Sequence, residues 1–206
     1  MEEDFVKQKK TVFMAEIAIL AALILIMAFT PIGYLRIGAL SLTLLMIPVS
    51  VGAVVMGPLA GAGLGCLFGL TSFAQCFMGD VLGSILAAKN IFFTFVVCVV
   101  SRTLAGLLCG VVYRLFRKKS GTVPLLVSNL LGSLLNTALF LGLLALLFWN
   151  FSFNPEQAQA LGGVDSALQT VILLATGINA PIELLVCGIA GTAVSKAVIK
   201  LNSIRV

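Results

Sequence analysis

Two ionisable residues stand inside apolar stretches of this chain, where a charge facing lipid is costly. Arg102 lies within VCVVSRTLAGLLCGVV (97–112), and an arginine at the centre of a membrane helix costs roughly 2.5–3.5 kcal/mol. Glu183, within ATGINAPIELL, is the only acidic residue at a similar depth. We therefore expect both side chains to face the interior of a helix bundle and to pair with each other when no solute is bound.

Amide side chains occur in the neighbouring hydrophobic stretches. Asn129 and Asn136 are seven residues apart and so share a helix face, while Asn179 lies one turn before Glu183. Together with Arg102, the side chains at positions 136, 179 and 183 would form a cavity for a small polar or anionic solute. A structural alternative stays open, in which these groups only hold the helices together.

The composition is that of an integral membrane protein. Only 10% of the 206 residues are charged and 60% are hydrophobic, the mean hydropathy is +1.16, and soluble domains carry about 25% charged residues. The chain has no histidine, which excludes histidine-based zinc sites and Ser-His-Asp hydrolases. Its five cysteines have no C-x-x-C spacing, so we interpret them as core residues. We expect no catalytic residue, no metal and no cofactor bound by this chain.

The hydropathy pattern predicts an all-α fold of six transmembrane helices that form one membrane domain over residues 1–206. Each apolar stretch is close to the length of about 20 residues that crosses a bilayer. A proline in the last stretch, Pro181, is expected to kink that helix. The expected spans are about 11–29, 40–56, 58–77, 90–113, 123–148 and 167–196.

Basic residues lie mainly on one side of these six spans. Ten of the 13 Lys and Arg residues occupy the N-terminal segment, the connection between the fourth and fifth spans and the C-terminus. The only basic residues in the loops of the other side are Arg36 and Lys89. The positive-inside rule then places both termini in the cytoplasm. Because topology accounts for the net charge of +5, nothing favours binding to nucleic acid.

Polar and aromatic residues gather at the opposite, outer side. Gln75, near the end of the third span, brings an amide toward the outer mouth. Between the fifth and sixth spans, WNFSFNPEQAQALGGVDSA (149–167) mixes aromatic and polar residues. This connection is either an anchor at the membrane interface or a lid over a binding site.

The run FTPIGYLRIGALSLTLLMIPVSVGAVVMGPLAGAGLGCLFGLTSF (29–73) resembles the substrate-binding S components of energy-coupling factor (ECF) vitamin transporters. The T-P-I-G-Y loop, the I-P-V sequence and the pattern G-P-x-A-G-x-x-L-G-x-x-F-G-L-T-S are most similar to pantothenate-type members. The resemblance extends more loosely over all six spans. It implies a non-enzymatic subunit that captures a vitamin outside a bacterial plasma membrane.

The resemblance also implies partners and site residues. Energy would come from a membrane-embedded T component and two cytoplasmic ATPases, which use ATP. The alanine motif that docks on the T component corresponds to Ala18 and Ala22 on the first helix. Ligand sites of the family lie near the outer face, and here they correspond to the polar set above together with Tyr34, Arg36, Lys89 and Asn90.

Pantothenate is the preferred substrate in this interpretation. Arg102 or Arg36 would neutralise its carboxylate, while Asn136 and Asn179 would bind its hydroxyl and amide groups. An S component for riboflavin or another B vitamin stays open, since Tyr34 offers a stacking surface. So does an ion-coupled secondary transporter of a small polar solute, with position 183 as the ion carrier, although the halves show no inverted repeat.

Overall fold

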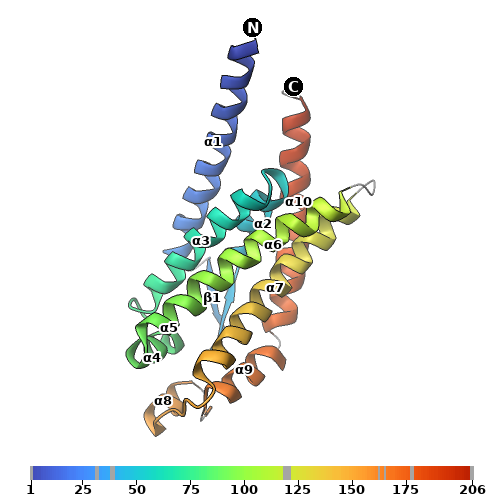
Figure 1. The fold of residues 1–206 in the computed structure, drawn as a ribbon. Helices are drawn as coiled ribbons and strands as arrows, with labels where there is room; N and C mark the ends of the chain where they lie inside the picture. Colours follow the sequence, from blue (N-terminus) through green and yellow to red (C-terminus); the bar gives the residue numbers. More distant parts are fainter. Residues whose placement is uncertain are drawn as a thin grey trace.

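The computed structural model describes residues 2–30, 33–37, 40–117, 122–161, 163–164, 166–176 and 179–204, and shows long helices packed around a short hairpin (Figure 1). Its elements, in chain order, are α1 (Glu2–Ala28), β1 (Tyr34–Ile37), β2 (Leu40–Thr43), α2 (Met46–Val55), α3 (Pro58–Gln75), α4 (Val81–Lys89), α5 (Ile91–Phe95), the π-helical turn η1 (Val96–Val100), α6 (Ser101–Phe116), α7 (Val123–Phe148), α8 (Pro155–Ala160), α9 (Ala167–Thr176) and α10 (Asn179–Ile204).

Four stretches of the described chain are helices long and apolar enough to cross a membrane. They are Thr11–Ala28, Ile91–Phe116, Val123–Phe148 and Pro181–Leu201, and they fall within or overlap four of the six predicted spans. Both termini lie at the same end of the bundle, with α4 and α8 at the other end (Figure 1). The count of six membrane crossings stays a prediction, as does the cytoplasmic side of the termini.

The second predicted span is wrong as a continuous helix. Residues 40–43 form strand β2, which pairs antiparallel with β1 from Tyr34 opposite Thr43 to Ile37 opposite Leu40. The helix that follows, α2, has only 10 residues and is therefore about 15 Å long. The chain is thus not purely α-helical: LSLT alternates apolar and polar residues as a strand does, and its hydropathy merges with that of α2.

The last predicted span is also divided. Instead of one kinked helix over 167–196, the structure has α9 and then α10, which starts at Asn179. Pro181 is the third residue of α10. A kink at Pro181 would involve the carbonyl of residue 177, which lies outside the described residues, so the kink stays a prediction.

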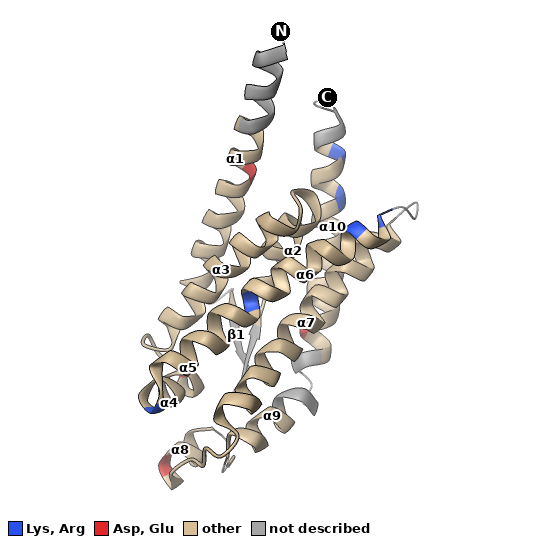
Figure 2. Cartoon of the chain, viewed as in Figure 1, with Lys and Arg blue, Asp and Glu red and all other residues tan. Residues whose placement is uncertain are grey.

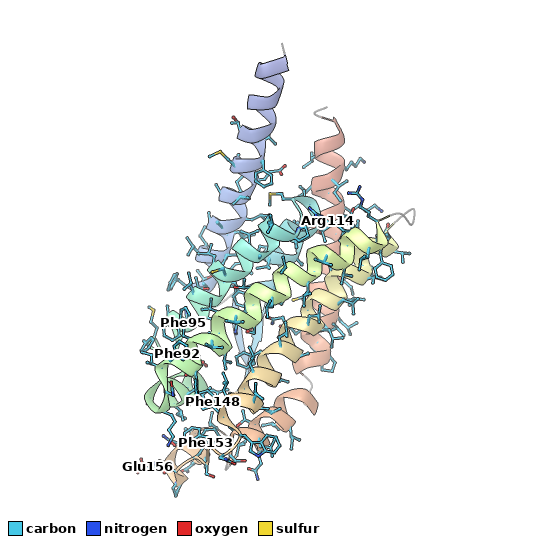
Figure 3. All side chains as sticks on the ribbon, viewed as in Figure 1. Phe92, Phe95, Arg114, Phe148, Phe153 and Glu156 are labelled. Atoms are coloured by element: carbon cyan, nitrogen blue, oxygen red, sulfur yellow. The ribbon has the colours of Figure 1, made fainter. Side chains whose placement is uncertain are left out.

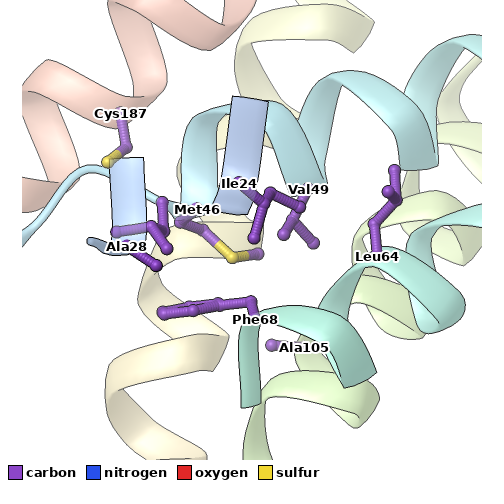
Figure 4. Packing of buried hydrophobic residues seen from close by; sticks show 9 residues of the cluster. Ile24, Ala28, Met46, Val49, Leu64, Phe68, Ala105 and Cys187 are labelled. Carbon is purple, nitrogen blue, oxygen red and sulfur yellow. The ribbon is translucent and has the colours of Figure 1, made fainter. Parts of the chain in front are cut away.

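The apolar core lies where α1, α2, α3 and α6 meet. Phe68 and Met46 are fully buried there, and Ile24 of α1 and Ala105 of α6 complete the contact (Figure 4). Cys187 brings α10 to the edge of the same cluster. Since all five cysteines are free thiols, this agrees with their interpretation as packing residues.

Glycines let α3 and α6 pack almost backbone to backbone. A Cβ atom at Gly65 would lie 2.3 Å from the backbone oxygen of Arg102, and one at Gly61 would lie 2.4 Å from that of Gly106. A Cβ at Gly69 would meet the backbone of Val99 at 2.6 Å. Such distances exclude any side chain unless the helices separate. The spacing of small residues in α3 therefore fixes where Arg102 lies relative to α3.

We expect Gly65→Val to destabilise the fold by about 2 kcal/mol or more, because the added side chain would clash with the backbone of Arg102, which cannot move aside as a flexible side chain could. Gly63→Val is the matched control, since a Cβ at Gly63 has nothing within 4 Å. Thermal unfolding of the purified variants in one detergent measures both. Equal melting temperatures for the two variants would contradict the close packing of α3 and α6.

Candidate functional site

A π-helical turn precedes the buried arginine. Val96–Val100 interrupts the α-helical hydrogen bonding of the span that contains α5 and α6, and π turns inside helices often occur at functional sites. The Arg102 side chain folds back on this turn, where its Nη1 donates to the carbonyl of Cys98 at 3.1 Å and to Ser101 Oγ at 3.4 Å. Figure 2 shows a basic residue midway along the continuous helix formed by α5, η1 and α6, away from those at the helix ends.

Aromatic rings hold the guanidinium group of Arg102. Its Cζ atom lies 4.8 Å from the ring centroid of Phe68 on α3 and 5.0 Å from that of Phe140 on α7. Arg102 is only 8% exposed, and its Nε has no hydrogen-bond partner among the described residues. Cation–π contacts thus replace part of the lost hydration, while one donor stays unsatisfied.

The expected ion pair between Arg102 and Glu183 does not form. Glu183 is 8% exposed, and its Oε2 instead accepts a hydrogen bond from the backbone N–H of Thr43 at 3.4 Å. The two charges still interact electrostatically. Glu183 Oε1 has no partner in the described part of the chain. Arg102 thus contacts two aromatic rings and Glu183 a backbone N–H, and neither group bonds to the other. Each side chain keeps one buried polar atom without a partner among the described residues.

The end of the hairpin is attached to α10 through the backbone of a single residue, Thr43. Glu183 accepts from the Thr43 N–H, and one turn later Cys187 Sγ donates to the Thr43 carbonyl at 3.7 Å. The contact brings β2 and α10 together beside the buried carboxylate.

The two asparagines of α7 have different surroundings. Asn136 is 6% exposed and its Oδ1 has no partner among the described residues. Asn129 Oδ1 also has no partner there, but its Nδ2 donates to the carbonyl of Leu125 at 2.8 Å and to Thr192 Oγ1 on α10 at 3.4 Å. Asn129 therefore links α7 to α10, as the structural alternative expects, whereas the part of Asn136 in a solute site stays a prediction.

Three predicted site residues have side chains outside the described residues. The backbone of Tyr34 and Arg36 belongs to strand β1, and that of Asn179 starts α10. Their places in a ligand site stay predictions. Since β1 pairs with β2, and β2 ends at Thr43 beside Glu183, the hairpin adjoins the buried polar groups.

Gln75 has a structural partner. Its Nε2 donates to the carbonyl of Ala28 at 2.6 Å, which ties the end of α3 to the last turn of α1 and satisfies a carbonyl that the helix leaves free. This bond occupies the amide nitrogen predicted to face a ligand.

Lys89 and Asn90 line a separate pocket at the end of the bundle remote from the termini. This pocket has a volume of about 330 Å³ and includes Trp149 and Phe151, but not Arg102. Lys89 Nζ lies 5.2 Å from the centroid of the Phe151 ring. Asn90 Oδ1 accepts from the N–H of Phe93 at 3.1 Å and so caps α5. The structure therefore divides the predicted site into an interior group around Arg102 and an outer pocket.

The connection between α7 and α9 is folded onto that outer end. Asn154 and Gln157 form a capping box that starts α8. Phe153 and Ala158 pack with Phe148 of α7 in a second apolar cluster, and Figure 3 shows Phe148 and Phe153 close to each other there. The connection thus covers the outer ends of the helices, and both the interface anchor and the lid stay open as predictions for it.

Sequence reasoning missed three residues that shape the interior group. Phe68 and Phe140 carried no signal because phenylalanine in a membrane helix is ordinary, and they meet Arg102 only through helix packing. Thr43 acts through its backbone N–H and its carbonyl, and no pattern of side chains in the sequence reveals such contacts. At the other face, Ala18 and Ala22 are exposed along α1, so their predicted docking stripe is accessible.

Comparisons with known proteins agree with this architecture. Residues 12–190 match the family model described as ECF transporter, substrate-specific component. No curated protein matches the chain. Among solved structures, ThiT from Listeria monocytogenes is similar in fold, with a TM-score of 0.60 and 22% sequence identity over 94% of this chain and 98% of that one. The chain belongs to the family of substrate-specific components of ECF transporters.

Proposed function

We propose that this chain captures a small carboxylate-bearing vitamin, with pantothenate as the preferred substrate. The observation that carries the proposal is a buried guanidinium without a carboxylate partner: Arg102 is 8% exposed, and its Nε is unsatisfied among the described residues. A ligand carboxylate would supply a charge-assisted hydrogen bond at that atom. Because the buried guanidinium has lost most of its hydration, pairing with a ligand carboxylate would be favourable.

Two of the other unsatisfied atoms match the rest of such a ligand. Asn136 Oδ1 and Glu183 Oε1 are acceptors without partners in the described chain, and pantothenate presents two hydroxyl groups and an amide N–H as donors. A pocket that pairs one cation with several acceptors selects a molecule with a carboxylate at one end and hydroxyls at the other. Tyr34 and Arg36 of β1 and Asn179 of α10 complete the proposed site.

A cationic vitamin is the second candidate. Glu183 offers a carboxylate oxygen without a partner among the described residues, and ThiT is among the solved structures similar to this chain. At 22% sequence identity, the likeness to ThiT is evidence for the fold alone and not for the ligand. Arg102 disfavours a cationic ligand, since binding such a ligand would place two positive charges in one cavity. Riboflavin or another B vitamin would need stacking surfaces, which the outer pocket offers in Trp149 and Phe151.

Transport would depend on partner subunits. The chain binds no cofactor in this proposal, and ATP is hydrolysed by two cytoplasmic ATPases that act through a membrane-embedded T component. Arg114 and Arg117 end α6, and Lys196 and Lys200 lie in the C-terminal half of α10. Figure 2 shows basic residues toward the end of the bundle where both termini lie, which supports a cytoplasmic face there. The substrate then enters from the opposite, outer side of a bacterial plasma membrane.

Calorimetry on the detergent-purified chain tests the substrate. We expect saturable binding of pantothenate, and no comparable binding of riboflavin, pyridoxine or thiamine. Arg102→Met, which keeps the bulk of the side chain, should weaken pantothenate binding about 30-fold or more, because it removes one partner of a buried charge pair. Arg114→Met is the control for a cation outside the site. Undiminished binding by Arg102→Met would disprove the assignment.

Glu183→Gln separates the two candidate ligand classes. The amide oxygen of Gln can still accept from the Thr43 N–H, so hairpin attachment is retained. With pantothenate we expect a loss of roughly 10- to 100-fold, the worth of one hydrogen bond to a charged group. A cationic vitamin would instead lose its counter-ion, and Arg102→Met would strengthen its binding. That reversed pattern in calorimetry would establish the second candidate.

Ala18→Trp tests the docking stripe on α1. A bulky side chain at this exposed position should block assembly with the T component and abolish vitamin uptake, while calorimetry still detects normal binding by the purified chain. Ile19→Trp is the matched control, because Ile19 is 66% exposed and points about 100° away around the helix. Co-purification of the partner subunits measures assembly. Equal assembly by both variants would locate docking elsewhere.

A further inference from the structure

A second cavity lies at the end of the bundle where both termini lie, far from the substrate site. It has a volume of about 430 Å³ and is formed by the end of α2, the Met56–Gly57 turn, the last turn of α6 and Ile199 of α10. Its polar lining includes Arg114 and Arg117. Figure 3 shows Arg114 at this end of the molecule, opposite Phe148 and Phe153.

The two guanidinium groups have no partner among the residues that the structure describes. Neither Arg114 nor Arg117 forms a side-chain hydrogen bond or an ion pair there. Arg114 also lies against the turn: its Nη2 would be 3.0 Å from a Cβ atom at Gly57, whose φ is +102°. Glycine at this position therefore keeps open the wall of the cavity nearest the cation.

The depth of the cavity matches a lipid headgroup. Arg117 directly follows the spanning stretch Ile91–Phe116, and Ile199 lies two residues before the end of Pro181–Leu201. Beyond the lining, Leu59 and Leu115 are 83% and 71% exposed. The cavity thus joins a cationic floor to an apolar flank, which matches the two parts of a phospholipid. Basic pockets between membrane helices bind anionic headgroups in this way.

We propose that this cavity binds the phosphate of an anionic phospholipid, with Arg114 and Arg117 as the phosphate ligands. Arginine presents planar donors that match phosphate oxygens. The acyl chains then run along the exposed apolar side chains beside α3 and α6. This site is independent of the vitamin site and of the identity of the vitamin.

The test uses the full chain purified in detergent and mixed with equimolar phosphatidylglycerol and phosphatidylcholine, followed by native mass spectrometry of bound lipid. We expect the wild type to retain phosphatidylglycerol over phosphatidylcholine about tenfold. The double variant Arg114→Gln/Arg117→Gln should lose most of that preference. So should Ile199→Trp, which fills the cavity and keeps both charges.

The matched control is Lys196→Gln/Lys200→Gln, which removes the same charge from the same end without touching the cavity lining. Equal loss of preference in this control would show general attraction of anions and overturn the proposal. Displacement of phosphatidylglycerol by inorganic phosphate at millimolar concentration would identify a free anion as the ligand instead. If the arginine double variant were less stable to heat but kept its lipid preference, the proposal would be wrong. Both arginines would then only stabilise the end of their helix.

Discussion

A charge buried in a membrane-spanning bundle must recover the hydration that it loses, and this requirement organises the structure around Arg102. Its Nη1 is satisfied within its own helix by the carbonyl of Cys98, and its ring contacts come from α3 and α7. Three elements therefore share one cation. The atom that they leave unsatisfied, Nε, is where the proposed ligand contributes most.

The position of this cation depends on the glycines of α3. Gly65 approaches the Arg102 carbonyl and Gly69 approaches Val99 in the π turn, so the two backbones fit together over the region that contains the arginine. Phe68 lies between these glycines in sequence and reaches the guanidinium from the same helix. Close packing and cation–π contact are thus two results of one helix pattern.

Sequence alone predicted which groups are buried better than it predicted their partners. A charge or an amide cannot face lipid, so the burial of Arg102, Glu183 and Asn136 follows from their depth. Their contacts depend on tertiary packing, and the expected Arg102–Glu183 pair is replaced by aromatic rings and a peptide group. Hydropathy also could not separate the strand at 40–43 from the helix that follows, because both are apolar.

The attachment of the hairpin to α10 has a consequence for how such a subunit can change its cargo during evolution. Both contacts use the N–H and carbonyl of residue 43 and none of its side-chain atoms. Substitutions along the hairpin therefore leave its point of attachment intact. The side chains of β1 and β2 can therefore change by mutation while the same main-chain contacts hold the hairpin beside the buried carboxylate.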